Sequence, residues 1–130
     1  MNEQLSYYNS KLAYEMDPSD LFTYLEESQE FVVLDTRQSH GFEKERIPGA
    51  INLPHREMTE ATTSHLDRTK TYVCYCDGIG CNASTKGAIK MTELGFKVME
   101  LIGGLEWWKF DGYATEGDVY SEGLAVKCAC

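Results

Sequence analysis

Cys76 lies where an apolar, strand-like run meets a glycine-bearing loop, which is a favourable position for a reactive thiol. The run 71–75 precedes it, and the loop 77–83 leads into a segment with helical spacing. Exposed loop amides and the positive end of a helix dipole both favour sulfur in its thiolate form. Because the thiolate is the nucleophilic form, we expect Cys76 to be a nucleophile. The alternative is a buried strand-end thiol with no chemistry.

The cysteine count adds a constraint on the other thiols. Five cysteines cannot all pair within one chain, and in a reducing compartment cysteines are more often reactive, metal-binding or buried than bridged. Cys74 is expected to be a small core hydrophobe that points away from Cys76. The count also allows a zinc site, but that direction of Cys74 disfavours it, so we expect no metal and no other cofactor.

Composition and charge exclude several classes of function. The chain has 130 residues, 42% of them apolar, which suits one globular domain. Its net charge of −9 argues against nucleic acid and anionic membranes as partners. No stretch has the length of a membrane span, and the first residues lack the features of a signal peptide. We therefore expect a cytoplasmic protein, either a monomer or a weak homodimer.

The elements that would position Cys76 alternate between strands and helices. Apolar runs without polar alternation predict strands covered on both faces. The predicted strands are 11–16, 31–34, 51–53, 71–75 and 98–102. Helices are predicted after Asp17 as N-cap, within 39–45, from Ser84 or Thr85 to Gly95, and after Gly104, whereas 57–66 is only weakly helical. This alternation predicts an α/β domain with a mostly parallel central sheet and helices on both faces.

In such a sheet, ligands bind at the carboxyl ends of the strands. Asp35 and Cys76 both follow predicted strands and therefore fall at that edge. Trp107 is expected in the core and Trp108 at the rim of the pocket. The three histidines, His40, His55 and His65, have no partner spacing and are expected on the surface.

Five segments, in this order, resemble the rhodanese-like (sulfurtransferase) domain family over roughly residues 11–115. They are Val33-Leu34-Asp35-Thr36-Arg37, Arg46-Ile47-Pro48-Gly49-Ala50-Ile51-Asn52-Leu53-Pro54, the unit formed by strand, Cys76, loop and helix, Leu94-Gly95-Phe96, and Leu101-Ile102-Gly103-Gly104-Leu105-Glu106-Trp107-Trp108. The resemblance implies an N-terminal extension over 1–10, a rhodanese-like domain over 11–115 and a tail over 116–130 that ends in Cys-Ala-Cys.

The resemblance also implies an activity. Cys76 would take a sulfane sulfur from a small donor or a protein persulfide, hold it as a persulfide, and pass it to a thiol or another nucleophilic acceptor. Backbone amides of the loop would bind the persulfide. The loop residues are Asp77, Gly78, Ile79, Gly80, Cys81, Asn82 and Ala83. Asp35 and Arg37 would support the loop from below.

The chain departs from the family pattern in ways that bear on the sulfur donor. Arg46 stands where the family usually has histidine, Cys81 stands where many members have arginine, and the loop is longer than the common form. Asp77 adds negative charge beside the nucleophile, so thiosulfate is a less suitable donor than a persulfide or polysulfide. The Cys-x4-Cys-Asn loop resembles a variant carried by a subset of the family.

The remaining cysteines and the rival functions follow from this reading. Cys81 is expected to be either a shielded loop residue or a resolving thiol that attacks oxidised or persulfidated Cys76. Cys128 and Cys130 are either a relay pair that collects the sulfur or a frayed end. The rivals are a non-catalytic module that binds a partner protein, and a thiol-redox sensor using Cys76 and Cys81. Phosphatase or arsenate-reductase chemistry is disfavoured, because no arginine lies between Cys76 and the next helix.

Overall fold

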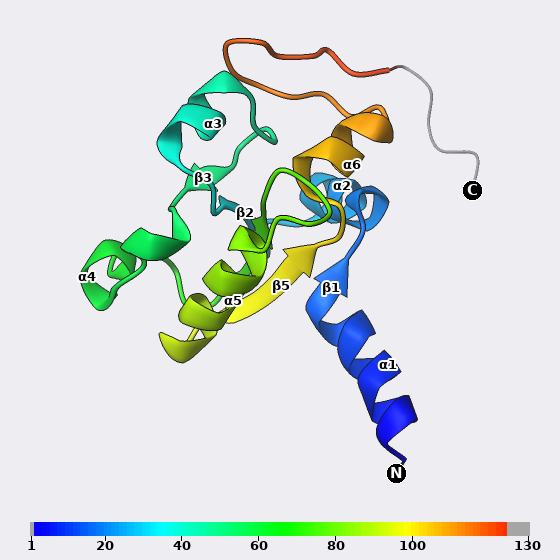
Figure 1. Cartoon of the computed structure of the whole chain (residues 1–130), viewed down its shortest axis with the longest axis vertical. Helices are drawn as coiled ribbons and strands as arrows, with labels where there is room; N and C mark the ends of the chain where they lie inside the picture. The colour runs from blue at the N-terminus through cyan, green and yellow to red at the C-terminus, as the bar shows by residue number, and fades with distance from the viewer. Residues whose placement is uncertain (1, 125–130) are drawn as a thin grey trace.

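A computed structural model describes residues 2–124 and contains one five-stranded parallel sheet (Figure 1). The strand order is β1-β5-β4-β2-β3, and each neighbouring pair is parallel. The strands are β1 (Glu15–Met16), β2 (Phe31–Asp35), β3 (Ile51–Asn52), β4 (Thr71–Tyr75) and β5 (Lys97–Leu101). The helices are α1 (Glu3–Tyr14), α2 (Pro18–Glu27), α3 (Ser39–Lys44), the 3-10 turn η1 (His55–Glu57), α4 (Glu60–Thr63), α5 (Ala83–Glu93) and α6 (Gly104–Phe110). The predicted fold class is confirmed.

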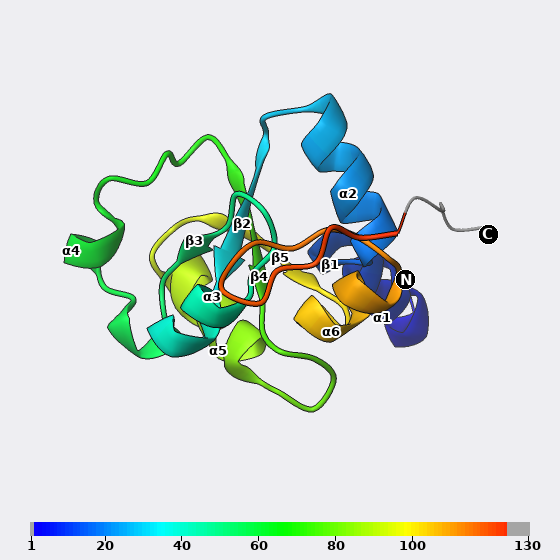
Figure 2. The ribbon, with the colours of Figure 1, turned by 90° about the horizontal axis from the view of Figure 1, so that it is seen from above.

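Helices cover both faces of the sheet (Figure 2), and each face has its own apolar cluster. On one face, α2 and α6 contribute Leu21, Leu105 and Trp108, which pack against Val33 and Val73. On the other face, Met91 of α5 and Met58 after η1 pack against Leu34, Tyr72 and Cys74. Since side chains alternate along a strand, β4 supplies one cluster with Val73 and Tyr75 and the other with Tyr72 and Cys74. The runs 31–34 and 71–75, which were expected to be buried strands, are therefore correctly assigned.

The N-terminal prediction is only partly correct. The strand expected over 11–16 is restricted to Glu15–Met16, and the preceding residues form α1, which has Asn2 as its N-cap and no buried residue. Figure 1 shows α1 extending away from the sheet. The next helix follows the prediction, because Asp17 accepts a hydrogen bond from the Asp20 amide and Pro18 occupies the first turn.

The chain returns after α6 to the opposite end of the sheet. Arg46 and Glu116 form an isolated antiparallel bridge, and the amides of Asp118 and Val119 donate to carbonyls at the end of α3, at 3.1 and 3.0 Å. In Figure 1 this segment runs across the top of the molecule from α6 towards α3. Residues 116–119, which the sequence assigned to a tail, are thus bonded to the domain. Within residues 2–124, no helix combines the length and the apolar character needed to cross a bilayer.

Candidate active site

The loop from Cys76 to the start of α5 leaves the sheet at its carboxyl edge and is tied to α6. Cys76 is 3% exposed and directly follows β4. The amides of Leu105 and Glu106 donate to the carbonyls of Cys76 and Asp77, at 2.9 and 2.8 Å. A Cβ atom at Gly104, whose φ is +59°, would collide with the Cys76 carbonyl. The glycine pair at the start of α6 therefore allows this helix to approach the loop closely.

Cys76 and Cys81 are joined by a disulfide, with their Cα atoms 6.3 Å apart. The loop closes through a turn in which the Cys81 amide donates to the Gly78 carbonyl at 3.3 Å, and Gly80 adopts a φ of +94°. Ile79, at the tip, is 80% exposed. In this closed state the Cys81 amide donates to the Gly78 carbonyl and is therefore not available to bind a persulfide.

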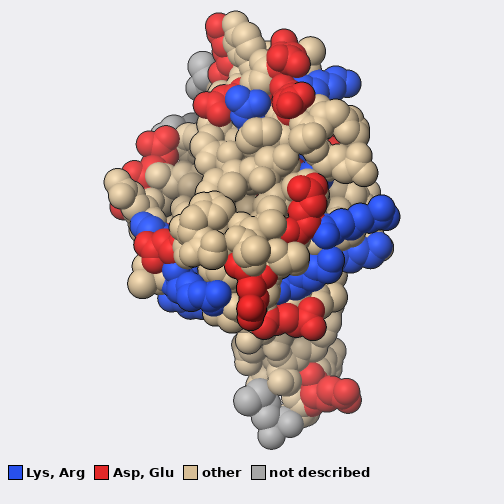
Figure 3. Space-filling view, turned by 90° about the vertical axis from the view of Figure 1, so that its left-hand side faces the viewer, with Lys and Arg blue, Asp and Glu red and all other residues tan. Residues whose placement is uncertain are grey.

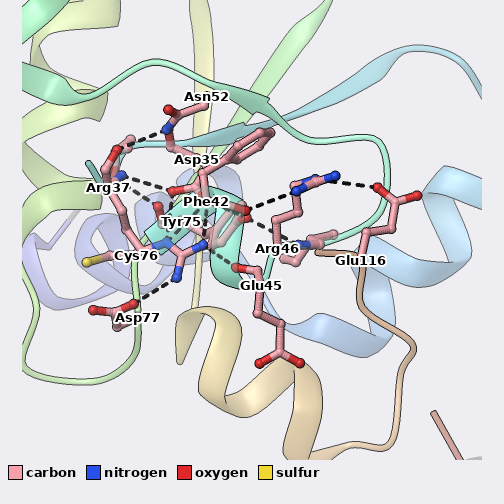
Figure 4. Close-up of polar contacts among 12 residues, drawn as sticks. Asp35, Arg37, Phe42, Glu45, Arg46, Asn52, Tyr75, Cys76, Asp77 and Glu116 are labelled. Atoms are coloured by element: carbon pink, nitrogen blue, oxygen red, sulfur yellow. Dashed lines mark hydrogen bonds and ion pairs between the residues drawn. The ribbon is translucent and has the colours of Figure 1, made fainter. Parts of the chain in front are cut away.

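Arg37 connects the end of β2 to this loop (Figure 4). Its guanidinium donates to both oxygens of Asp35, to Asp77 Oδ1 at 3.0 Å and to the Glu45 carbonyl at 2.6 Å. Burial alone would lower the pKa of Arg37, but the hydrogen bonds and charges of Asp35 and Asp77 raise it above its ordinary value. The negative charge that Asp77 brings beside Cys76 is therefore in direct contact with a cation, which Asp77 shares with Asp35.

Asp35 is fully buried and is satisfied on every side. It accepts from Tyr75 Oη at 2.7 Å and from the Arg37 amide at 2.9 Å, in addition to the guanidinium. Tyr75 Oη in turn accepts from the Ile47 amide at 3.2 Å. Burial and the nearby Asp35 carboxylate raise the pKa of Tyr75, so its hydroxyl remains a donor. The structure thus brings Asp35 and Arg37 to the base of the loop.

A cleft of about 450 Å³ opens beside the two sulfurs and is lined by Cys76 and Cys81. His40 from α3 and His55 and Arg56 from η1 form much of the opposite wall. Burial, followed by the charges of Lys86, Lys90 and Arg56, lowers the pKa of His55. Figure 3 shows one face of the molecule, with basic side chains gathered along its right-hand side next to acidic ones. Among the lining residues, Arg37 and Arg56 are matched by Glu57 and Asp77, so the cleft carries no net formal charge although the whole chain carries −9.

The sequence placed His40 and His55 on the surface without a role, and both line the cleft. The sequence did contain a signal for His55, because this residue lies three positions after the end of β3, at the carboxyl edge that holds the site. Glu45 was missed altogether. It is 7% exposed and accepts from Lys109 Nζ at 2.7 Å and Thr115 Oγ1 at 2.6 Å, across more than 60 residues of chain. Nothing local in the sequence indicates those partners.

Cys74 lies in the core as expected, but its predicted direction is wrong. Residues two apart on a strand share a face, and Cys74 packs with Leu34 and Met91 beneath α5. Cys76 lies on that same side, where Ala83 of α5 also lines the cleft. The two residues differ in their access to the cleft. Cys76 lines it, whereas Cys74 is fully buried, and burial raises the pKa of the Cys74 thiol. An elevated pKa disfavours the thiolate, as suits a core residue.

Two further local predictions are wrong. The first concerns the start of α5, which was expected at Ser84 or Thr85. Its N-cap residue is Asn82, which makes no side-chain cap bond, and the hydroxyls of Ser84 and Thr85 donate to Glu100. The two tryptophans are exchanged relative to the prediction. Trp108 is 2% exposed in the core, and Trp107 is 38% exposed and stacks on Phe110. The relay thiols Cys128 and Cys130 lie outside the described residues.

Comparisons with known proteins agree with the fold. The family model of the rhodanese-like domain matches residues 18–111. The structure of the BH2092 protein from Bacillus halodurans is similar, with 35% identity, a TM-score of 0.88, and coverage of 98% of this chain and 94% of that one. A thiosulfate sulfurtransferase from Pseudomonas aeruginosa has a TM-score of 0.70 over 92% of this chain and 23% of its own, at 20% identity, which shows the fold alone.

A curated relative is considerably longer than this chain. The HTH-type transcriptional regulator Rv0324 of Mycobacterium tuberculosis is 28% identical over 104 residues. The match spans 76% of this chain and 46% of the regulator, so the chain covers about half of that relative.

Proposed function

The chain belongs to the rhodanese-like domain family, and we propose that it is a sulfurtransferase with Cys76 as the nucleophile that carries the persulfide. The observation that carries the proposal is the position of Cys76. It sits at the carboxyl end of β4 and lines a cleft that also receives the end of β2 and the start of α5. This is the edge of a parallel sheet at which ligands bind.

The first step transfers one sulfur atom. The Cys76 thiolate attacks the outer sulfur of a donor R–S–SH, the S–S bond of the donor breaks, and the donor leaves as R–SH with the proton. Cys76 then carries –S–S⁻, and a thiol acceptor takes the terminal sulfur in the second step. Hydrogen bonds to an ionised acceptor are about twice as strong as neutral ones. In the reduced loop, amides between Gly78 and Ala83 supply such bonds.

The chemistry of the cleft favours a persulfide donor over thiosulfate. Arg37, the cation nearest the loop, is already bonded to two carboxylates and a carbonyl, which leaves it little capacity for a small dianion. A volume of about 450 Å³ suits a larger molecule. Arg56, on the η1 side of the cleft, can pair with a carboxylate of a small thiol persulfide. We also propose that the Cys-x4-Cys-Asn loop is a variant form within the family.

Intact-mass spectrometry tests the proposal. The fully reduced Cys81→Ser protein, which cannot form the disulfide with Cys76, is incubated with glutathione persulfide or thiosulfate, and a gain of one sulfur, about 32 Da, is expected at Cys76. Glutathione persulfide is expected to load faster. Cys76→Ser should gain nothing at that position. Equal sulfur transfer by the wild type and Cys76→Ser would instead favour a non-catalytic module that binds a partner, as part of a longer protein.

The disulfide favours a second candidate, a thiol-redox sensor that uses Cys76 and Cys81. In that case dilute peroxide would oxidise Cys76 to a sulfenic acid, and Cys81 would condense with it. Fast closure of the disulfide by peroxide, together with no sulfur gain at Cys76 of the Cys81→Ser protein from any persulfide, would support the sensor and contradict the transferase.

A further inference from the structure

The loop contains a second thiol that is already within bonding reach of the nucleophile. Resting on the proposed function, we propose that Cys81 discharges the Cys76 persulfide: it attacks Cys76 Sγ, releases the outer sulfur as hydrogen sulfide, and leaves the Cys76–Cys81 disulfide. The chain would then convert persulfides to sulfide at the expense of a dithiol, with Cys81 as the immediate reductant of the Cys76 persulfide.

The fold holds both cysteines in position for this reaction. Cys76 is fixed by β4 and by the bond from Leu105 to its carbonyl, and Asp77 is fixed by Arg37 and by the Glu106 amide. Cys81 is followed at once by Asn82, whose carbonyl accepts the first helical bond of α5, from Lys86 at 3.0 Å. A Cα separation of 6.3 Å lies within the usual range for a disulfide. Closure therefore requires movement of only the residues between Asp77 and Gly80.

The loop itself is built to make that movement. Gly80 adopts a φ of +94°, and a side chain at that position would meet open space, so no packing opposes rearrangement there. Ile79, at the tip, is 80% exposed and contributes little burial. By contrast, a Cβ at Gly78 would approach Glu106 to 2.9 Å, so the base of the loop stays against α6. The two ends are fixed and the tip is free to fold over.

The structure also indicates which sulfur Cys81 attacks. In the closed loop its Sγ is bonded to Cys76 Sγ, the inner sulfur of the persulfide. Attack there expels the outer sulfur, and hydrogen sulfide is a stronger acid than an alkyl thiol, which makes it the better leaving group. Attack on the outer sulfur would require Cys81 to lie one bond length further from Cys76.

The step balances without an external oxidant. Cys76–S–SH and Cys81–SH give Cys76–S–S–Cys81 and H₂S. The bond between Cys76 Sγ and the outer sulfur breaks, and a bond between the two cysteine sulfurs forms. The outer sulfur is reduced to sulfide, the Cys81 sulfur is oxidised, and the oxidation state of Cys76 Sγ does not change. The proton of Cys81 leaves with the hydrosulfide.

A dithiol must then reopen the loop. Cys76 is 3% exposed, whereas Cys81 is partly exposed, so an incoming thiolate reaches Cys81 and expels Cys76 as the leaving thiolate. The second thiol of the dithiol then displaces Cys81 and completes the reduction. This places the chain after a reaction that makes low-molecular-weight persulfides and before one that consumes sulfide.

A single-turnover experiment tests the inference. Cys128→Ser/Cys130→Ser protein is reduced, freed of reductant and mixed with one equivalent of glutathione persulfide, and both sulfide and intact mass are followed. Release of about one sulfide per chain is expected, with a final mass about 2 Da below that of the reduced chain. The same protein with Cys81→Ser should instead hold the added sulfur at Cys76 and release sulfide at least about tenfold more slowly. Cys81→Ala repeats the comparison, with circular dichroism to show that each variant is folded.

Each other result contradicts the inference in a recognisable way. Sulfur gain at Cys76 that persists equally with and without Cys81 refutes the discharge step and leaves the transferase standing. Sulfur recovered on Cys81 without sulfide release shows relay in place of discharge. No sulfur gain in any variant overturns the transferase and the inference together. Glutathione disulfide is the control, because it closes the loop without producing sulfide.

Discussion

Arg37 connects three separate parts of the chain at the site. It bonds Asp35 at the end of β2, Asp77 in the loop and the carbonyl of Glu45 after α3. The Asp35 pair is buried, with side-chain exposures of 9% and 0%, whereas Asp77 is 74% exposed. The buried ion pair with Asp35 therefore contributes more to stability than the exposed ion pair with Asp77.

Replacing Arg37 by Gln is expected to destabilise the fold by about 3–5 kcal/mol, because it leaves the buried Asp35 carboxylate without its cation. Arg46→Gln is the matched control. Its ion pair with Glu116 is longer, at 3.7 Å, and half exposed, so a loss of less than about 1 kcal/mol is expected. Denaturant unfolding of both variants measures the difference. Equal losses would show that Asp35 is stabilised mainly by Tyr75 and the backbone.

Sequence reasoning succeeded for residues whose role depends on their place along a strand. Asp35 and Cys76 were assigned to one edge, because the carboxyl ends of parallel strands share an edge. Sequence reasoning failed for contacts between residues that only the folded chain brings together. The pairing of Asp77 with Arg37 joins residues 40 apart, and no local pattern distinguishes it from two solvated charges. The negative charge of Asp77 beside Cys76 was predicted correctly, but its ion pair with Arg37 was not.

At the scale of elements, the contact between α6 and the loop determines where Cys76 lies. The amides at the start of α6 bind the carbonyls of Cys76 and Asp77, and Gly104 allows the approach. The sequence predicted a short helix after the glycine pair but not its contact with the loop. A glycine pair predicts a turn, whereas the partner that approaches it is set by the packing of α6 on the sheet.

Gly104→Ala is expected to lower both stability and the rate of sulfur loading. The φ of +59° alone costs about 1–3 kcal/mol for a residue with a Cβ, and the new methyl group also collides with the Cys76 carbonyl. Gly80→Ala is the control, since its φ of +94° carries a similar penalty but its Cβ would meet open space. Thermal unfolding and the persulfide-loading rate are measured for both variants. Effects that the two share come from backbone strain, and effects seen only in Gly104→Ala come from the collision with the Cys76 carbonyl. Identical loading rates would mean that α6 does not position the nucleophile.

At the scale of the molecule, the segment after α6 joins the two ends of the domain. Glu45, at the end of α3, is bonded to Lys109 of α6 and to Thr115 beyond it. Burial alone would raise the pKa of Glu45, but the hydrogen bonds from Lys109 and Thr115 and the nearby charges lower it. This single carboxylate therefore links the return of the chain to the side of the cleft that α3 forms.

The lowered pKa of Glu45 makes part of the stability depend on pH. A carboxylate whose pKa is depressed by folding contributes stability above its unfolded value of about 4.5, and this is lost as the pH falls through the folded pKa. Glu45→Gln is expected to be less stable than the wild type at pH 7, and the gap should narrow below about pH 4. Urea unfolding from pH 7 to 3 measures it, with Glu27→Gln as an exposed control. A gap that stays constant with pH would assign the loss to packing alone.

The Cys76–Cys81 disulfide also affects how the protein must be assayed. A closed loop has no free nucleophile, so a sample purified in air would show a specific activity set by its oxidation history and not by its intrinsic rate. Two preparations of identical purity would disagree, and a dithiol in the buffer would make them agree. The fraction of Cys76 that iodoacetamide alkylates, mapped by mass spectrometry before each assay, therefore provides the correct denominator, which is the number of open loops and not the number of chains.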